Sequence, residues 1–191
     1  MASECVRVFN GLRKRDYSIR RITSWAFSCI PEMIIDRFQD FQAEEVANLI
    51  RRNLLEIISK YYSPDYVASL VNSFSSEQIL EKARTQYIFV AIEEDNVIGT
   101  GSLADYGSTE MPSYYGTAIF IALEFQRKGI GKQIMQKVEA KAVEMGADKL
   151  TVRAARNARV FYEKLGYTYW NGIATQDEKG NYVMEKVLVQ L

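Results

Sequence analysis

The sequence has 191 residues, of which 48% are hydrophobic and 25% charged, and this suits one compact soluble domain with an apolar core. Lys plus Arg and Asp plus Glu each total 24, so the net charge gives no argument for nucleic acid or an acidic surface as the partner. The sequence contains no histidine, which excludes histidine-based triads, imidazole general bases and histidine-ligated metals, and we expect no metal.

Residues 1–32 are interpreted as an N-terminal extension. Basic residues at 13–15 and 20–21 precede an apolar run at 22–30, which weakly resembles a signal peptide. Polar residues inside the run favour instead a helix or strand packed on the domain, and a native start at Met33 is a third possibility. Cys5 and Cys29 have no metal-type spacing and are expected to be free thiols in a reducing compartment. No apolar run approaches the about 20 residues that a bilayer requires, so no membrane span is expected.

The part of the chain from residue 33 to 103 predicts a strand, three helices and a hairpin. Ser63 before Pro64 is a helix start signal, and Ser75 or Ser76 caps the next helix. The predicted elements are strand 33–38, a helix from 44 to 61, a helix from 63 to 70, a helix from 75 or 76, and strands 87–92 and 97–103. The polar residues 93–96 join the last two strands as a hairpin connection.

The rest of the chain predicts a long strand, a helix, a strand, a short helix and a terminal hairpin. The predicted elements are strand 113–123, a helix that reaches 145, strand 150–153, a helix within 157–166, and strands 167–174 and 182–189. Residues 177–181 are rich in turn formers, which suits an antiparallel hairpin between the last two strands.

The segment Gln126–Gly131 lies between the long strand and the following helix. Glycine allows a tight turn and a close approach of the backbone to a ligand. The first N–H groups of a helix have no partner within the helix, so phosphate oxygens can accept their hydrogen bonds. The segment lacks the third glycine of the dinucleotide fingerprint and the Gly-Lys-Ser/Thr end of a P-loop. It therefore predicts a polyphosphate site of another kind.

Two motifs together resemble a known family. Gln126–Gly131 is similar to Gln/Arg-x-x-Gly-x-Gly/Ala, the acetyl-coenzyme A loop of the GCN5-related N-acetyltransferases (GNAT). About 30 residues later, Asn157–Tyr167 resembles the family's second signature, Asn-x-x-x-x-Phe-Tyr-x-x-x-Gly-Phe/Tyr. The resemblance covers roughly residues 33–188 and implies a GNAT domain at 33–191. The implied fold is α/β, with a mixed, mostly antiparallel sheet that is splayed at the acetyl-CoA site and flanked by helices. Leu123 and Ala155 depart from the proline and serine of many relatives.

The resemblance implies a cofactor site made largely of backbone groups. Main-chain groups around Phe120, Ile121 and Ala122 would pair with the pantetheine arm, although these residue types equally suit a buried strand. N–H groups from Arg127 to Lys132 would bind the pyrophosphate. The residues expected to bind acetyl-CoA are Phe120, Ile121, Ala122, Gln126, Arg127, Lys128, Gly129, Ile130, Gly131, Lys132, Asn157 and Tyr162.

The catalytic residues implied by the resemblance are Tyr162 and an acidic general base. A phenol with a pKa of about 10 is protonated at neutral pH and can donate a proton to the departing thiolate, although Tyr162 could also be a core aromatic. Asn157 could bind the coenzyme, cap a helix or do both. A carboxylate or an ordered water must accept the proton of the amine. Glu110 and Glu124 flank the long strand and are the candidate bases. Glu124 falls on the phosphate side in the family layout and Glu110 could instead sit in a solvated loop, and Glu110 is the residue named for the role.

Several other side chains could line the site. Arg153, Arg156 and Arg159 could reach the 3′-phosphate of the coenzyme or form a solvated face. Tyr87, Tyr114 and Tyr115 could line the acceptor pocket, although strand aromatics usually pack or pair across strands.

The resemblance implies a cytoplasmic N-acetyltransferase that moves acetyl from acetyl-CoA directly to a primary amine of a small molecule or peptide. A non-catalytic acyl-CoA-binding or sensing module is the alternative, and a binder of another nucleotide is a third possibility. Homodimers are common in the family, and the terminal hairpin or the N-terminal extension could supply an interface.

Overall fold

The computed structural model describes residues 33–188, which belong to one compact unit. The expected N-terminal extension, with both cysteines, lies outside the described residues. No helix within residues 33–188 is long and apolar enough to cross a membrane.

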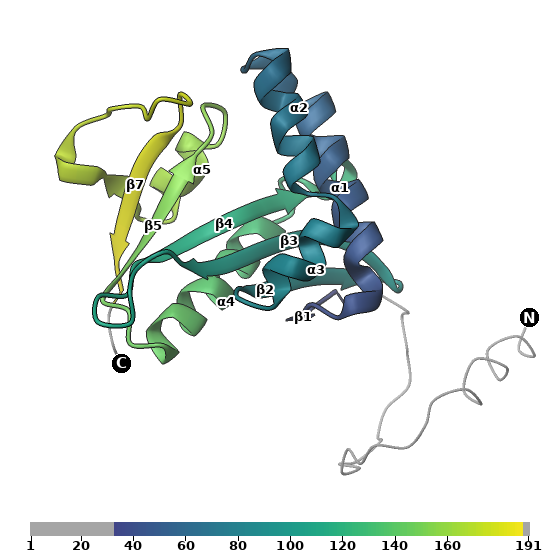
Figure 1. The fold of residues 1–191 in the computed structure, drawn as a ribbon, viewed down its shortest axis with the longest axis horizontal. Helices are drawn as coiled ribbons and strands as arrows, with labels where there is room; N and C mark the ends of the chain where they lie inside the picture. The colour runs from purple at the N-terminus through teal and green to yellow at the C-terminus, as the bar shows by residue number, and fades with distance from the viewer. Residues whose placement is uncertain (1–32, 189–191) are drawn as a thin grey trace, which may run out of the picture. The chain divides into compact units, whose positions relative to one another are not determined.

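The architecture is a seven-stranded mixed sheet with helices on both faces (Figure 1). The sheet order is β1-β2-β3-β4-β5-β7-β6, and every neighbouring pair is antiparallel except β4 and β5. The strands are β1 (Ile34–Arg37), β2 (Tyr87–Glu93), β3 (Asn96–Asp105), β4 (Tyr114–Ile121), β5 (Lys149–Ala154), β6 (Thr168–Tyr169) and β7 (Tyr182–Val187). The expected fold class is confirmed.

The α-helices follow the expected order along the chain. They are α1 (Ala43–Glu56), α2 (Pro64–Ser73), α3 (Ser76–Ala83), α4 (Ile130–Glu144) and α5 (Arg159–Lys164). Ser63 caps α2 by accepting a hydrogen bond from the backbone N–H of Tyr66, and Ser75 caps α3 in the same way through Gln78. The predicted caps are therefore confirmed, with Ser75 rather than Ser76 in the second case.

Each face of the sheet has its own apolar core. α4 packs on one face with Ile134, Met135 and Val138 fully buried, and α1 packs on the other with Val46 and Ile50. α4 approaches β3 closely because Gly101 has no side chain there, and a Cβ at this position would collide with the side chain of Ile134. Close packing of α4 fixes the position of its N-terminus against the sheet.

The terminal hairpin differs from its prediction. A full strand was expected at 167–174, but β6 contains Thr168–Tyr169 and is followed by a 3-10 turn at Trp170–Gly172. Asn171 and Gly172 have positive φ angles of 54° and 72°, which end the extended conformation. The predicted helix up to residue 61 likewise ends at Glu56 and continues as a separate 3-10 turn, Ile58–Lys60.

Candidate functional site

A gap between β4 and β5 forms the centre of the site. These parallel strands are in register at Tyr115 with Thr151 and at Gly116 with Val152, and beyond these pairs they separate. In Figure 1, β4 runs toward the right of the view while β5 runs upward, and β7 lies antiparallel beside β5. A cavity of about 810 Å³ occupies this region and is lined by residues of β4, the glycine loop, α4, α5, α1 and α2. The splayed sheet therefore leaves a strand edge free for a ligand.

A β-bulge reshapes β4 next to this gap. The register with β3 shifts between the pairs Thr100 with Phe120 and Ser102 with Thr117. Ala118, inside the bulge, has a positive φ of 52°, an unusual conformation for a residue with a side chain. A bulge takes backbone groups out of the ladder and redirects them. The bulge was not predicted.

The three backbone positions expected to meet the pantetheine do not all face the gap. Ala122 donates its N–H to the carbonyl oxygen of Ile98 at 2.8 Å, so this group points to the β3 side. Because backbone groups of successive strand residues point to opposite edges, those of Phe120 also point toward β3 and those of Ile121 point into the gap. Of the three expected residues, Ile121 is therefore the one whose backbone N–H can donate a hydrogen bond to a ligand in the gap.

The glycine loop presents a set of N–H groups at the start of α4. Arg127 and Gly129 have positive φ angles of 62° and 84°, and Gly129 is the residue that precedes the helix. The first hydrogen bond of the helix runs from Gln133 N to Gly129 O at 3.2 Å. The N–H groups of Ile130, Gly131 and Lys132 therefore have no partner within the helix. They open onto the cavity, which these residues line.

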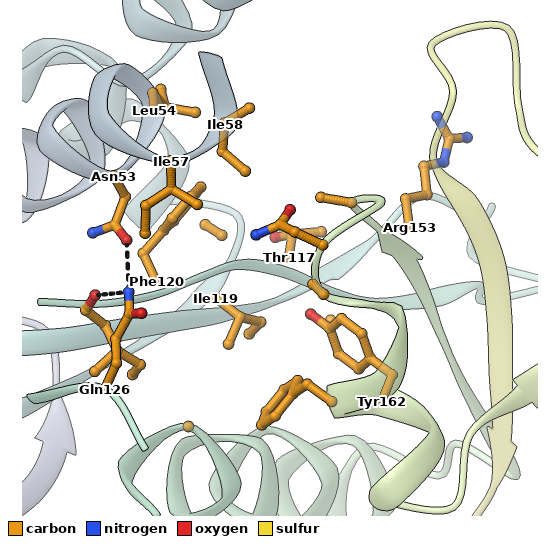
Figure 2. Close-up of a pocket in the computed structure, with 18 of the residues that line it drawn as sticks. Asn53, Leu54, Ile57, Ile58, Thr117, Ile119, Phe120, Gln126, Arg153 and Tyr162 are labelled. Atoms are coloured by element: carbon orange, nitrogen blue, oxygen red, sulfur yellow. Dashed lines mark hydrogen bonds between the residues drawn. The ribbon is translucent and has the colours of Figure 1, made fainter. Parts of the chain in front are cut away.

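The side chains of the loop have separate roles. Arg127 and Lys132 line the cavity, but Lys128 does not, and its ammonium lies 4.5 Å from the centre of the Phe125 ring. Gln126 turns its amide inward and donates hydrogen bonds to Asn53 Oδ1 at 3.3 Å and to Ile121 O at 3.2 Å (Figure 2). Gln126 thus fastens the loop to α1 and β4.

Tyr162 reaches the same cavity from α5. Its side chain is 6% exposed and its ring packs edge to face against Phe161 and Tyr167, at centroid distances of 5.0 and 5.6 Å. Figure 2 shows its hydroxyl directed into the cavity. Burial raises the pKa of Tyr162 above its ordinary value, so the hydroxyl stays protonated at neutral pH. Tyr162 therefore combines core packing with a hydroxyl that can donate a proton.

Asn157 lines the cavity, whereas only one of the three arginines considered for the coenzyme does. Asn157 is exposed and lines the cavity, while α5 begins after Ala158, so Asn157 is not the helix cap. Arg156 lies over the Tyr62 ring at 5.4 Å and donates to two backbone carbonyls, and Arg159 pairs with Glu163 at 3.6 Å. Of the three arginines, Arg153 is the one that lines the cavity.

Neither candidate general base lines the cavity. Glu110 is exposed in the connection between β3 and β4, so its position gives no support to the proposed role. Glu124 pairs with Arg52, and its own backbone N–H and this guanidinium hold its pKa below the ordinary value. The structure thus leaves both carboxylates outside the site. Glu110 lies away from it because the connection that contains this residue folds back on itself through Asp105, which accepts a hydrogen bond from Ser113 N at 2.7 Å.

An apolar wall from α1 and α2 lies opposite α5. Its members are Leu54, Ile57, Ile58, Leu70 and Phe74, and none of them was predicted to line a site. Of the tyrosines considered for the acceptor side, Tyr87 and Tyr114 do not line the cavity, and the Tyr114 hydroxyl donates to Met145 O at 3.0 Å. Tyr115 lines a neighbouring, smaller cavity instead.

Polar contacts join the start of α2 to the terminal hairpin above the cavity. The Tyr62 hydroxyl donates to Asn181 Oδ1 at 2.8 Å and accepts from Arg156 N at 3.1 Å. Burial raises the pKa of Tyr62, so this hydroxyl stays protonated and able to donate. Residues from three distant parts of the chain thereby hold the two walls of the cavity together.

Comparisons with known proteins agree with this geometry. A family model described as an acetyltransferase (GNAT) domain matches residues 58–183, and no curated protein matches at a significant level. Solved structures share the fold at low sequence identity. The PaiA N-acetyltransferase of Thermoplasma acidophilum, solved with coenzyme A, is 17% identical with a TM-score of 0.69, covering 82% of this chain and 99% of its own.

Two further structures are similar to this chain. A GCN5-related N-acetyltransferase from Rhodopseudomonas palustris is 18% identical with a TM-score of 0.68, covering 86% of this chain and 100% of its own. An aminoglycoside 6′-N-acetyltransferase solved with coenzyme A is 14% identical with a TM-score of 0.62, covering 82% and 97%. Since the family model covers more than half of the 191 residues, the chain belongs to the GNAT acetyltransferase family.

Proposed function

We propose that this protein transfers acetyl from acetyl-CoA directly to a primary amine in a ternary complex, without a covalent enzyme intermediate. The observation that carries the proposal is that one cavity joins the open edge of β4, the N-terminus of α4 and the hydroxyl of Tyr162. The proposed catalytic domain is 33–191. Its need for the cytosolic coenzyme A pool assigns the activity to the cytoplasm.

The N-terminus of α4 would hold the pyrophosphate of the coenzyme. The N–H groups of Ile130, Gly131 and Lys132 can donate to phosphate oxygens, and the helix dipole favours negative charge at this end. Arg127 and Lys132, which both line the cavity, add positive charge. Gly131 lets this end of α4 lie against α5, since a Cβ at residue 131 would be 3.2 Å from the ring of Phe161.

The open edge of β4 would align the thioester. The N–H of Ile121 faces the gap and can pair with the amides of the pantetheine arm. The bulge at Ala118 supplies backbone groups outside the ladder, and an N–H held there would stabilise the negative charge that develops on the carbonyl oxygen during attack.

Tyr162 would supply the proton for the leaving group. As the amine nitrogen forms its bond to the carbonyl carbon, the carbon–sulfur bond breaks and the Tyr162 hydroxyl gives its proton to the sulfur. The attacking nitrogen loses one proton to water, and the Tyr162 oxygen regains a proton from solvent. The products are the N-acetylated amine and free coenzyme A, so atoms and charge balance.

The test is a mass-spectrometric screen for acetyl transfer from acetyl-CoA into a panel of small amines, peptides and polyamines. Gly129→Glu is the control, because a carboxylate at residue 129 would repel the phosphates. Product from the unaltered protein alone supports the proposal. Binding of acetyl-CoA in calorimetry without any product would favour the sensing module, and loss of both product and binding would overturn the coenzyme A assignment.

A further inference from the structure

The charged side chains that line the main cavity, within the described residues, are all basic. They are Arg127, Lys132, Arg153, Lys164 and Lys179. Arg127 and Lys132 belong to the phosphate loop and α4, and Lys164 ends α5, whereas Arg153 lies on β5 and Lys179 lies before β7. Three cations, Arg153, Lys164 and Lys179, are therefore placed outside the phosphate loop and α4. Such a cavity repels a polycationic acceptor and attracts an acceptor with a negative group.

Arg153 is the best placed of these three cations to meet an acceptor at β4. Its neighbours in β5, Val152 and Ala154, are fully buried, while Arg153 itself is exposed to the cavity. Its guanidinium lies 5.8 Å from the centre of the Tyr115 ring, and no carboxylate between residues 33 and 188 forms an ion pair with it. A guanidinium can bind a carboxylate through two parallel hydrogen bonds.

A second cavity of about 410 Å³ adjoins the first at this arginine. Gly116, Thr117, Ala118 and Arg153 line both cavities, and the second one ends on the aromatic side chains Tyr106 and Tyr115. These two rings pack at a centroid distance of 5.3 Å. The arginine therefore stands beside the bulge in β4, where the proposed acetyl transfer takes place.

The opposite wall of the main cavity is apolar. Leu54, Ile57 and Ile58 of the α1 end face the space across from Arg153 (Figure 2), and Phe74 and Phe120 extend this surface with an edge-to-face ring pair at 6.2 Å. An acceptor in this space would bury apolar surface on one side and meet a cation on the other.

We infer, on the basis of the proposed acetyltransferase function, that the acceptor is a small amine that carries a carboxylate and an apolar group, and that Arg153 binds the carboxylate. The amine lies at the bulge of β4, the apolar group rests against α1, and the carboxylate reaches Arg153. Polyamines and aminoglycosides, which are polycations, are poor acceptors for this cavity.

The test compares acceptors that differ in a single feature. Phenylalanine and phenylalaninamide share the amine and the apolar ring, but the amide lacks the carboxylate; spermidine represents the polycations. The full chain should acetylate phenylalanine with a kcat/KM at least roughly tenfold above that for either of the others, which is the usual effect of one charge-assisted contact. The α-amine of phenylalaninamide is less basic than that of phenylalanine, so a larger fraction of it is neutral at a given pH. Amine ionisation alone would therefore make phenylalaninamide the better acceptor.

Arg153→Gln locates the effect. It should lower kcat/KM for phenylalanine at least roughly tenfold through the acceptor KM and collapse the preference over the amide, and Arg153→Lys should restore part of it. Arg84→Gln is the matched control, since Arg84 lies at the C-terminal cap of α3, pairs with Glu81 and does not line the cavity.

Three outcomes would overturn the inference. A higher rate with phenylalaninamide or spermidine refutes the acceptor class while the acetyltransferase function stands. A rise in the KM for acetyl-CoA in Arg153→Gln, with an unchanged acceptor preference, assigns Arg153 to the coenzyme instead. Absence of product with these three amines, while another amine of the broader panel is acetylated, refutes the acceptor class alone; absence of product across the whole panel removes the proposed function, and the inference falls with it.

Discussion

Tyr162 and Tyr167 pack edge to face at a centroid distance of 5.6 Å, yet their hydroxyls point to different surroundings. The Tyr167 hydroxyl donates to Glu139 Oε1 at 3.0 Å on α4, whereas the Tyr162 hydroxyl is directed into the main cavity. Both side chains are buried, at 2% and 6% exposure for Tyr167 and Tyr162. Two tyrosines of one cluster therefore differ mainly in what their oxygens contact.

This difference makes a matched pair of variants. Tyr162→Phe removes the proton donor and should lower kcat by roughly 100-fold, the scale of general acid catalysis, while the affinity for acetyl-CoA stays within about twofold. Tyr167→Phe removes a buried hydroxyl of the same cluster and should cost about 1 kcal/mol of stability with kcat retained. Steady-state kinetics, calorimetry and urea unfolding measure these effects. Equal losses of kcat in both variants would contradict the proton-donor role.

Gly129 lies in the phosphate loop and Gly146 does not, but both have the same left-handed conformation, so Gly146 can serve as the control for the strain that a substitution of Gly129 introduces. Their φ angles are 84° and 83°, and a Cβ at either position would have nothing within 4 Å. Alanine at either site should therefore cost about 1 kcal/mol of unfolding free energy through the left-handed conformation. Gly129→Ala should in addition weaken acetyl-CoA binding roughly tenfold by disturbing the N–H groups, about 1.4 kcal/mol. Unfolding in urea and calorimetry separate the two effects, and equal affinities in both variants would remove the loop from the coenzyme site.

The pH dependence of the rate should follow the acceptor rather than Tyr162. Burial raises the pKa of Tyr162, so its donor form persists to a higher pH than that of a free phenol. The kcat/KM for the acceptor should then rise with pH as the amine loses its proton, near pH 8 for an α-amine of a peptide, and should not fall before about pH 10. A pH profile of the unaltered protein checks this. A falling limb near neutral pH that disappears in Tyr162→Phe would place the pKa of Tyr162 far lower.

Much of the fold follows from local signals in the sequence. The caps at Ser63 and Ser75, the hairpin at residues 93–96 and the glycine loop before α4 were predicted because each depends on a few neighbouring residues. The terminal hairpin was predicted less well. The positive φ angles at Asn171 and Gly172 end β6 early. The sequence predicted one longer strand because apolar residues lie on both sides of this turn.

The candidate site was predicted in part. The loop and Tyr162 were found through spacing within short motifs, and the structure brings them to one cavity, although their roles stay predictions. The position of Glu110 could not be read from its neighbours, because it depends on how the connection after β3 folds back through Asp105. The apolar wall of α1 and α2 resembles an ordinary core stripe in the sequence, since a side chain that lines a cavity and one that fills a core have the same composition.

The order of the elements, the glycine turn before α4 and the family could be read from the sequence, because turns, caps and motif spacing are local properties of the chain. A splayed sheet was expected from the family resemblance, but the bulge at Ala118 and the placement of an apolar wall across from Arg153 emerged only in the folded structure. These features depend on strand register and on contacts between residues far apart in the chain, which no short stretch of sequence specifies.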